Sequence, residues 1–242
     1  MKASRSIRIL YLAALALGSV LASSTPALGD GGMTEYHQAQ AYDPGEIALL
    51  PRYCIYTQLF RARVPGGSNK VEIDRWYEVM GRSFHHMHHY CWGLMHTNAA
   101  LYKPLTRPDR MRRLNYSIQE FDYVIRNVAP NFALLPEILT TKGKNLIRLG
   151  RGWLAIPELQ RAINLKPDYW PPYAAISDYY REIGDLAKAR EWLEKGLSVT
   201  PDVKALKSRL AQLEGAKDMR KTAPQPTPRP AAPEPATQSK PD

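Results

Sequence analysis

A period of 34 residues runs through the second half of the chain and constrains its fold more than any other feature. Between its copies, apolar residues recur every three or four positions, and the pattern stops at glycine or proline, which is typical of amphipathic helices. The period therefore predicts consecutive pairs of antiparallel helices. Four pairs of identical residues carry it: Gly150 and Gly184, Ala155 and Ala189, Leu159 and Leu193, and Pro167 and Pro201.

In this region the chain resembles the tetratricopeptide repeat family. Small residues let two helices approach closely, large ones fill the space between them, and a proline ends the second helix. The resemblance implies an all-α solenoid of helix hairpins, with repeats over residues 136–169 and 170–203 and a capping helix over residues 202–215. The matching positions are Leu139, Gly143, Leu146, Ala155, Leu159, Ala162 and Pro167 in one unit, and Tyr173, Ser177, Tyr180, Ala189, Leu193, Gly196 and Pro201 in the next. One departure is Lys142, which stands where an apolar residue is usual.

Two repeats are too few to bury a continuous face, so a third unit is expected upstream. We predict a degenerate repeat over residues 83–135, in which Ser83 caps a helix that runs to about Leu101 and Trp92-Gly93 takes the place of the leucine-glycine pair. Residues 30–82 are expected to form a helical N-terminal extension.

The two ends of the chain differ from the middle. Residues 1–22 carry Lys2, Arg5 and Arg8 and then thirteen uncharged residues, the layout of a signal peptide, with cleavage as late as residue 29. The alternative is a membrane anchor, but thirteen residues of helix reach only about 20 Å. We therefore expect a periplasmic or secreted protein without a membrane span after cleavage. Residues 216–242, rich in proline, predict a disordered tail.

The chain has a formal net charge of +10, yet its cations are scattered and lack interleaved aromatic residues. Together with the expected export, this argues against a nucleic-acid partner. An acidic protein or an anionic polysaccharide of the envelope suits this charge better.

Cys54 and Cys91 are the two cysteines of the chain. In an oxidising compartment they are expected to pair, which would close a loop of about 37 residues and add about 4 kcal/mol of stability in the chain-entropy model. The alternative is two buried free thiols, because the sequence does not give their separation in space.

Five of the six histidines lie in residues 84–96. On one helix, His85, His89 and His96 would share a face, and a pair four residues apart can ligate one metal. The competing interpretations are packing between helices and contact with a partner. This stretch has no acidic residue for a metalloprotease base, and the sequence lacks C-x-x-C-H, a nucleophile-elbow motif and a phosphate-binding glycine loop. We expect neither catalysis nor a cofactor.

The family resemblance also implies a concave groove lined by the first helix of each repeat. Lys144 and Arg148 lie one turn apart and could grip a carboxylate, or they form a solvated face. We predict a non-catalytic adaptor that binds an envelope protein or peptide; the alternative is a metal-binding or redox accessory protein that uses residues 85–96 and both cysteines. The groove positions are Met87, Tyr90, Leu94, Asn98, Thr140, Lys144, Ile147, Arg148, Ala174, Asp178 and Arg181. The sequence assigns no oligomeric state.

Overall fold

A computed structural model describes residues 42–222, and the side chains of residues 42–215. Every regular element in this part of the chain is helical. The order is α2 (Pro44–Ala48), η1 (Arg52–Tyr56), α3 (Lys70–Met80), η2 (Gly81–His86), α4 (Met87–Tyr102), α5 (Arg107–Asn127), α6 (Leu135–Arg148), α7 (Gly152–Leu165), α8 (Pro171–Glu182), α9 (Leu186–Val199) and α10 (Lys204–Thr222), where η marks a 3-10 helix.

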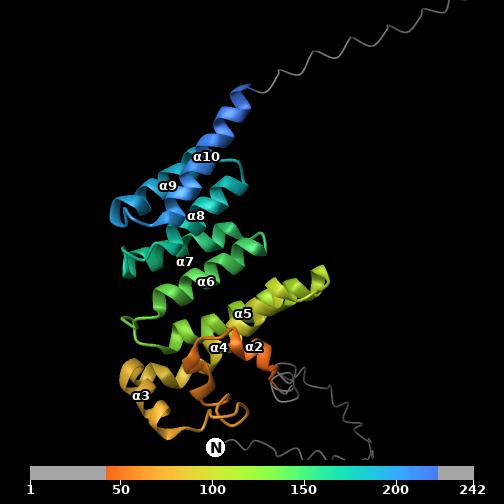
Figure 1. Cartoon of the computed structure of the whole chain (residues 1–242), viewed down its shortest axis with the longest axis vertical. Helices are drawn as coiled ribbons and strands as arrows, with labels where there is room; N and C mark the ends of the chain where they lie inside the picture. Colours follow the sequence, from red (N-terminus) through yellow and green to blue (C-terminus); the bar gives the residue numbers. More distant parts are fainter. Residues whose placement is uncertain (1–41, 223–242) are drawn as a thin grey trace, which may run out of the picture. The chain divides into compact units, whose positions relative to one another are not determined.

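The helices from α4 onward pack as consecutive pairs (Figure 1). Helix α4 pairs with α5, α6 with α7, and α8 with α9, while α10 packs against α9. The predicted all-α helical solenoid is therefore confirmed. Helix α10 extends to Thr222, beyond the expected end of the capping helix and into the stretch that the sequence predicts as disordered. The predicted signal peptide and residues 223–242 lie outside the described residues.

Two glycines account for the sharp turns inside the repeat pairs. Gly150 follows α6 with φ 72° and Gly184 follows α8 with φ 85°, a left-handed conformation that side chains with a Cβ atom disfavour. In both turns the second helix begins two residues after the glycine. The 34-residue spacing of these glycines thus reflects one turn geometry used twice.

Close approach of paired helices depends on two other glycines. A Cβ atom on Gly143 of α6 would lie 2.7 Å from Cγ of Leu159 in α7. A Cβ atom on Gly93 of α4 would lie 2.4 Å from the Phe121 ring in α5. Both neighbours are fully buried, so the pairs α4–α5 and α6–α7 use the same contact of a glycine with a large apolar residue.

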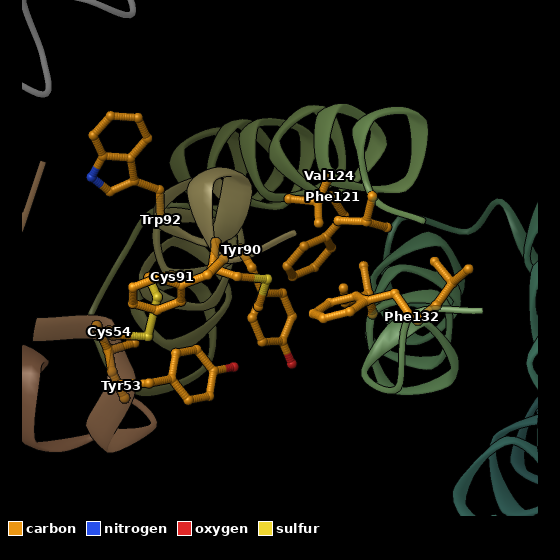
Figure 2. Close-up of a cluster of buried hydrophobic side chains, with 14 of the residues drawn as sticks. Tyr53, Cys54, Tyr90, Cys91, Trp92, Phe121, Val124 and Phe132 are labelled. Atoms are coloured by element: carbon orange, nitrogen blue, oxygen red, sulfur yellow. A yellow bond between two sulfur atoms is a disulfide. The ribbon is translucent and has the colours of Figure 1, made fainter. Parts of the chain in front are cut away.

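The N-terminal segment, residues 42–69, packs on α4 and is held there by a disulfide. Cys54 in η1 and Cys91 in α4 are bonded, with a Cα–Cα distance of 5.7 Å, which confirms the predicted pairing. Figure 2 shows this bond beside Tyr53 and Tyr90. Tyr42 stacks on Phe60 at 4.6 Å, so aromatic side chains fill the contact around the bridge. One face of α4 is consequently covered.

The structure explains why Lys142, a polar residue, occupies a repeat position that is usually apolar. Its ammonium group lies 2.7 Å from Asp122 of α5 and 2.5 Å from Glu158 of α7. The Lys142 side chain is only 12% exposed, so this network of one ammonium and two carboxylates joins two neighbouring helix pairs where little water reaches it.

Within residues 42–222, no helix is long and apolar enough to cross a membrane.

Candidate partner-binding surface

Helix α6 places Lys144 and Arg148 one turn apart on a partly open face between α4, α8 and α10. The opposite face of α6 carries Leu139 and Leu146, which are buried against the neighbouring helices. This amphipathic pattern fixes the rotation of the helix, so the two cations between the buried positions point away from the core. Arg148 is exposed and Lys144 is half-buried.

A buried asparagine orients Arg148. Asn145 is fully buried, and its amide nitrogen donates to Thr97 of α4 at 2.7 Å and to Ser117 of α5 at 2.8 Å. Its carbonyl oxygen accepts a 2.8 Å hydrogen bond from the guanidinium of Arg148. Because Thr97 and Ser117 also bond each other at 2.8 Å, the network joins three helices and anchors one cation of the surface.

Lys144 lies in a positively charged environment. Burial, followed by the charges of Arg148 and Arg209, lowers the pKa of Lys144, while Asp178 and Glu137 oppose the effect. Asp178 is already engaged, because Nε of Arg209 lies 3.2 and 3.3 Å from its two carboxylate oxygens. Three cations from α6 and α10 therefore share this surface with one carboxylate of α8 that has its own partner.

A second polar cluster lies at the N-terminal end of α6. The hydroxyl of Tyr90 donates to Glu137 at 2.6 Å, and burial raises the pKa of this tyrosine well above its usual range. Burial and then the charge of Glu137 raise the pKa of Tyr169 to about 12. The carboxylate of Glu137 is thus bound by protein groups at the boundary of the core, and the acidic end of α6 is separated by two turns from its basic end.

Four of the predicted groove residues do not line an open surface. Met87 and Tyr90 are both 0% exposed, because the N-terminal segment with Tyr53 and Cys54 covers this face of α4. Thr140 is buried and donates to the carbonyl of Pro136, and Ala174 is buried in the cluster that contains Leu206 of α10. The prediction was wrong for these positions. Segments at the two ends of the array cover Met87, Tyr90 and Ala174, whereas Thr140 is buried in the middle of the array.

The other predicted groove residues remain accessible to different degrees. Arg148 and Arg181 are exposed, and Lys144, Asn98 and Asp178 are partly exposed. Leu94 and Ile147 are also partly exposed, but each packs against an apolar cluster of the core. The open stretch therefore comprises α6, α8 and the C-terminal half of α4.

The histidines do not assemble the alternative metal site. Helix α4 begins at Met87, so His85 lies in η2 and is not in helical phase with the others; Ser83 accepts from the amide of Ala129 instead of capping the helix. His89 bonds Glu120 at 2.5 Å, and His96 lies 3.3 Å from Arg113. Within residues 42–215, no group of three or more histidine, cysteine or acidic side chains could hold a metal ion.

The structure also argues against a redox role of the two cysteines. Cys54 and Cys91 are bonded to each other, and both are 0% exposed. A thiol reagent must reach a sulfur atom to exchange a disulfide, so this bridge is protected in the folded chain. It has the properties of a structural cross-link.

Sequence reasoning missed two residues that shape the surface, Arg209 and Asn145. Arg209 lies on α10, which the sequence indicates only as a cap, and it is not related by the 34-residue period to Lys144 or Arg148. Asn145 precedes the periodic apolar residues Leu146 and Ile147 and is not part of the repeat pattern. A buried asparagine in an amphipathic helix gives no sequence signal until its partners on other helices are known.

Comparison with known proteins agrees with the helix pairing. Residues 171–203 match the tetratricopeptide repeat family model. The matched stretch spans α8 and α9 and ends just before α10. No curated protein matches the chain. The family match thus supports a repeat unit of a protein-interaction fold at the C-terminal half of the open surface.

Proposed function

We propose that the chain is a non-catalytic interaction module that binds an acidic segment of another protein across α6, α8 and α10. The observation that carries this proposal is a group of three cations: Lys144 and Arg148 on the open stretch of a tetratricopeptide-like array, and Arg209 on the adjoining helix α10. These three residues form the basic surface. Helical repeats of this kind bind extended segments along their accessible faces.

The charges of the basic surface are not balanced within the described residues. Asp178 pairs with Arg209 and also with Arg181, at 3.4 Å. In residues 42–215, neither Lys144 nor Arg148 forms an ion pair with a carboxylate. A carboxylate from a partner would relieve the repulsion between these two side chains and gain charge-assisted hydrogen bonds.

Pre-organisation favours binding at Arg148. Its guanidinium is already held by Asn145, so part of the side-chain entropy that binding would cost has been lost in folding. Burial lowers the pKa of Arg148, and the phenol group of Tyr102 at the end of α4 opposes this effect; Tyr102 is 71% exposed. Tyrosine and arginine side chains are common anchors at protein interfaces.

We also propose that the protein acts in the bacterial cell envelope after export. The signal-like residues 1–22 support this location. The Cys54–Cys91 disulfide supports it independently, because stable disulfides belong to oxidising compartments. Another envelope protein is then the expected partner.

Charge reversal tests the basic surface. The full mature chain and its Lys144→Glu/Arg148→Glu variant are titrated with a fluorescent peptide of alternating glutamate and alanine, read by anisotropy. We expect the variant to bind at least about tenfold more weakly. The matched control is Arg161→Glu/Lys166→Glu, at one exposed position within α7 and one directly after it, which changes the net charge equally. Far-UV circular dichroism should be the same for all three proteins.

Two results contradict the proposal. If the control weakens binding as much as the test variant, net charge alone attracts the peptide. If the test variant binds normally, Lys144 and Arg148 form only a solvated face. Affinity capture from envelope extracts with the same three proteins then shows whether a natural partner follows the same order.

A further inference from the structure

A pocket of about 780 Å³ lies between the end of α3, η2 and the end of α5, and it shares no residue with the basic surface. Helix α3 and η2 pack together, and η2 also contacts α5, so the three elements form its walls. This volume is typical of sites for small organic molecules. The lining residues are Tyr77, Met80, Gly81, Arg82, Ser83, His85, His86, Asn127 and Ala129.

Several polar side chains line the pocket beside its apolar surface. Arg82 supplies a guanidinium, His85 and His86 supply imidazoles, and Asn127 supplies an amide. None of the described residues that line the pocket is acidic, and within residues 42–215 Arg82 has no carboxylate partner. The wall is therefore positively charged and suited to an anion.

One polar atom at the pocket has no partner in the protein. Nδ1 of His86 is buried and forms no hydrogen bond within the described residues. An unsatisfied buried nitrogen costs about 1–3 kcal/mol, so natural proteins seldom keep one without a reason. Because Nδ1 itself is closed to solvent, a molecule in the pocket would meet the remainder of the His86 ring, which lines the pocket.

We infer that this pocket binds a small organic molecule with a phosphate or carboxylate group, held by Arg82 and His86, whose apolar part packs on Tyr77 and Met80. Tyr77 is 39% exposed, and its ring already makes an edge contact with Phe84 on one side. A ring or chain of the ligand fits its other side, because exposed aromatic faces gain from apolar contact. A ligand with both an oxyanion and an apolar part accounts for the volume of the pocket, which is much larger than an inorganic ion needs.

The same arrangement predicts proton uptake on binding. Burial, followed by the charges of His85 and His89, lowers the pKa of His86, so its imidazole is neutral near pH 7. The groups that face it are His85 of η2, His89 of α4 and Tyr123 of α5, with Arg82 and Tyr77 also at the pocket. An anion beside His86 favours the protonated ring and should raise its pKa.

The test follows the histidine ring signals of the full mature chain by NMR across a pH titration. Three probes are compared: phenyl phosphate, inorganic phosphate and benzyl alcohol, which has a ring but no charge. We expect phenyl phosphate to raise the pKa of His86 saturably by about one pH unit, with the pKa of His96 unchanged. Inorganic phosphate should act at higher concentration, and benzyl alcohol should have no such effect.

Two variants make the test specific. Arg82→Gln should weaken phenyl phosphate binding about tenfold, since it removes a charge-assisted contact. Arg161→Gln, at an exposed arginine on α7, should bind as the unchanged protein does. No shift of His86 with either phosphate, or an equal shift in Arg82→Gln, overturns the inference. An effect of inorganic phosphate without any advantage of phenyl phosphate overturns the assignment of an organic ligand.

Discussion

Substituting alanine for Gly93 tests the close contact of α4 with α5. The new Cβ atom would lie 2.4 Å from Cε1 and 2.7 Å from Cδ1 of Phe121, whereas ordinary contacts of this kind begin at 3.4 Å. The ring must therefore move by about 1 Å, but Phe121 is 0% exposed and packs against Tyr90 at a ring distance of 5.6 Å. It has no free space into which to move.

The expected loss of stability follows from two opposing effects. Overpacking of a tight core costs about 1–3 kcal/mol, and the upper part of this range suits a ring without free space. Alanine recovers about 1 kcal/mol through its better helix propensity. Gly93→Ala should therefore lower the free energy of unfolding by about 1–2 kcal/mol, and Tm by about 3–6 °C for a domain of this size.

The measurement is thermal and urea unfolding of the oxidised protein, followed by far-UV circular dichroism. Gly215→Ala is the matched control, because Gly215 also lies in a helix but its Cβ atom would meet nothing within 4 Å. It should leave stability unchanged or raise it by up to about 1 kcal/mol. If Gly93→Ala is as stable as Gly215→Ala, the two helices do not approach each other as described.

Three further predictions concern the disulfide, the buried asparagine and a buried histidine. Replacing Cys54 and Cys91 by serine should lower the free energy of unfolding by about 4 kcal/mol in urea titrations, and dithiothreitol should then have no further effect on the variant. Asn145→Ala should cost about 2–3 kcal/mol and weaken binding of the acidic peptide several-fold, whereas Asn164→Ala, at an exposed site on α7, should do neither. The pKa of His88 is lowered to about 4, chiefly by burial. Because the unfolded chain takes up this proton near pH 6.5, stability should be full above that pH and fall by about 3 kcal/mol as the pH drops to about 4; His88→Gln should flatten this part of a pH series of urea unfolding.

The helix pairs could be predicted from the sequence because their determinants are local and repeated. Gly150 and Gly184 each end a helix with a positive φ, and Gly143 meets Leu159 within a single hairpin. Such features recur at a fixed interval and so leave a visible period. The disulfide was predictable for another reason, since two cysteines in an expected oxidising compartment have one pairing available.

The open surface was harder to predict because it depends on contacts between segments far apart in the sequence. Met87 and Tyr90 occupy repeat positions that face outward in the family pattern, yet here the segment around Cys54 lies over them. Ala174 is covered in the same way by Leu206 of α10. Neither covering segment shares the 34-residue period, so the pattern carries no information about where it packs.

The proposed metal face failed for a local reason. His85 would share a face with His89 only on a regular α-helix, but the 3-10 turn of η2 extends to His86. A 3-10 segment advances about 120° per residue instead of 100°, so side chains before Met87 fall out of phase with those after it. No residue in this stretch marks that change clearly in the sequence.

Because segments outside the repeats cover both ends of the array, the proposed binding surface has a limited length. Helix α8 packs against α6 and is joined to α10 by the ion pair of Asp178 with Arg209. Since helices packed side by side are separated by about 8–10 Å, the surface from α6 to α10 spans roughly 20 Å. An extended peptide advances about 3.3 Å per residue and would cross this distance in about six residues. Under the proposed function, this face is therefore matched to a short linear motif, and a longer partner would extend beyond its edges.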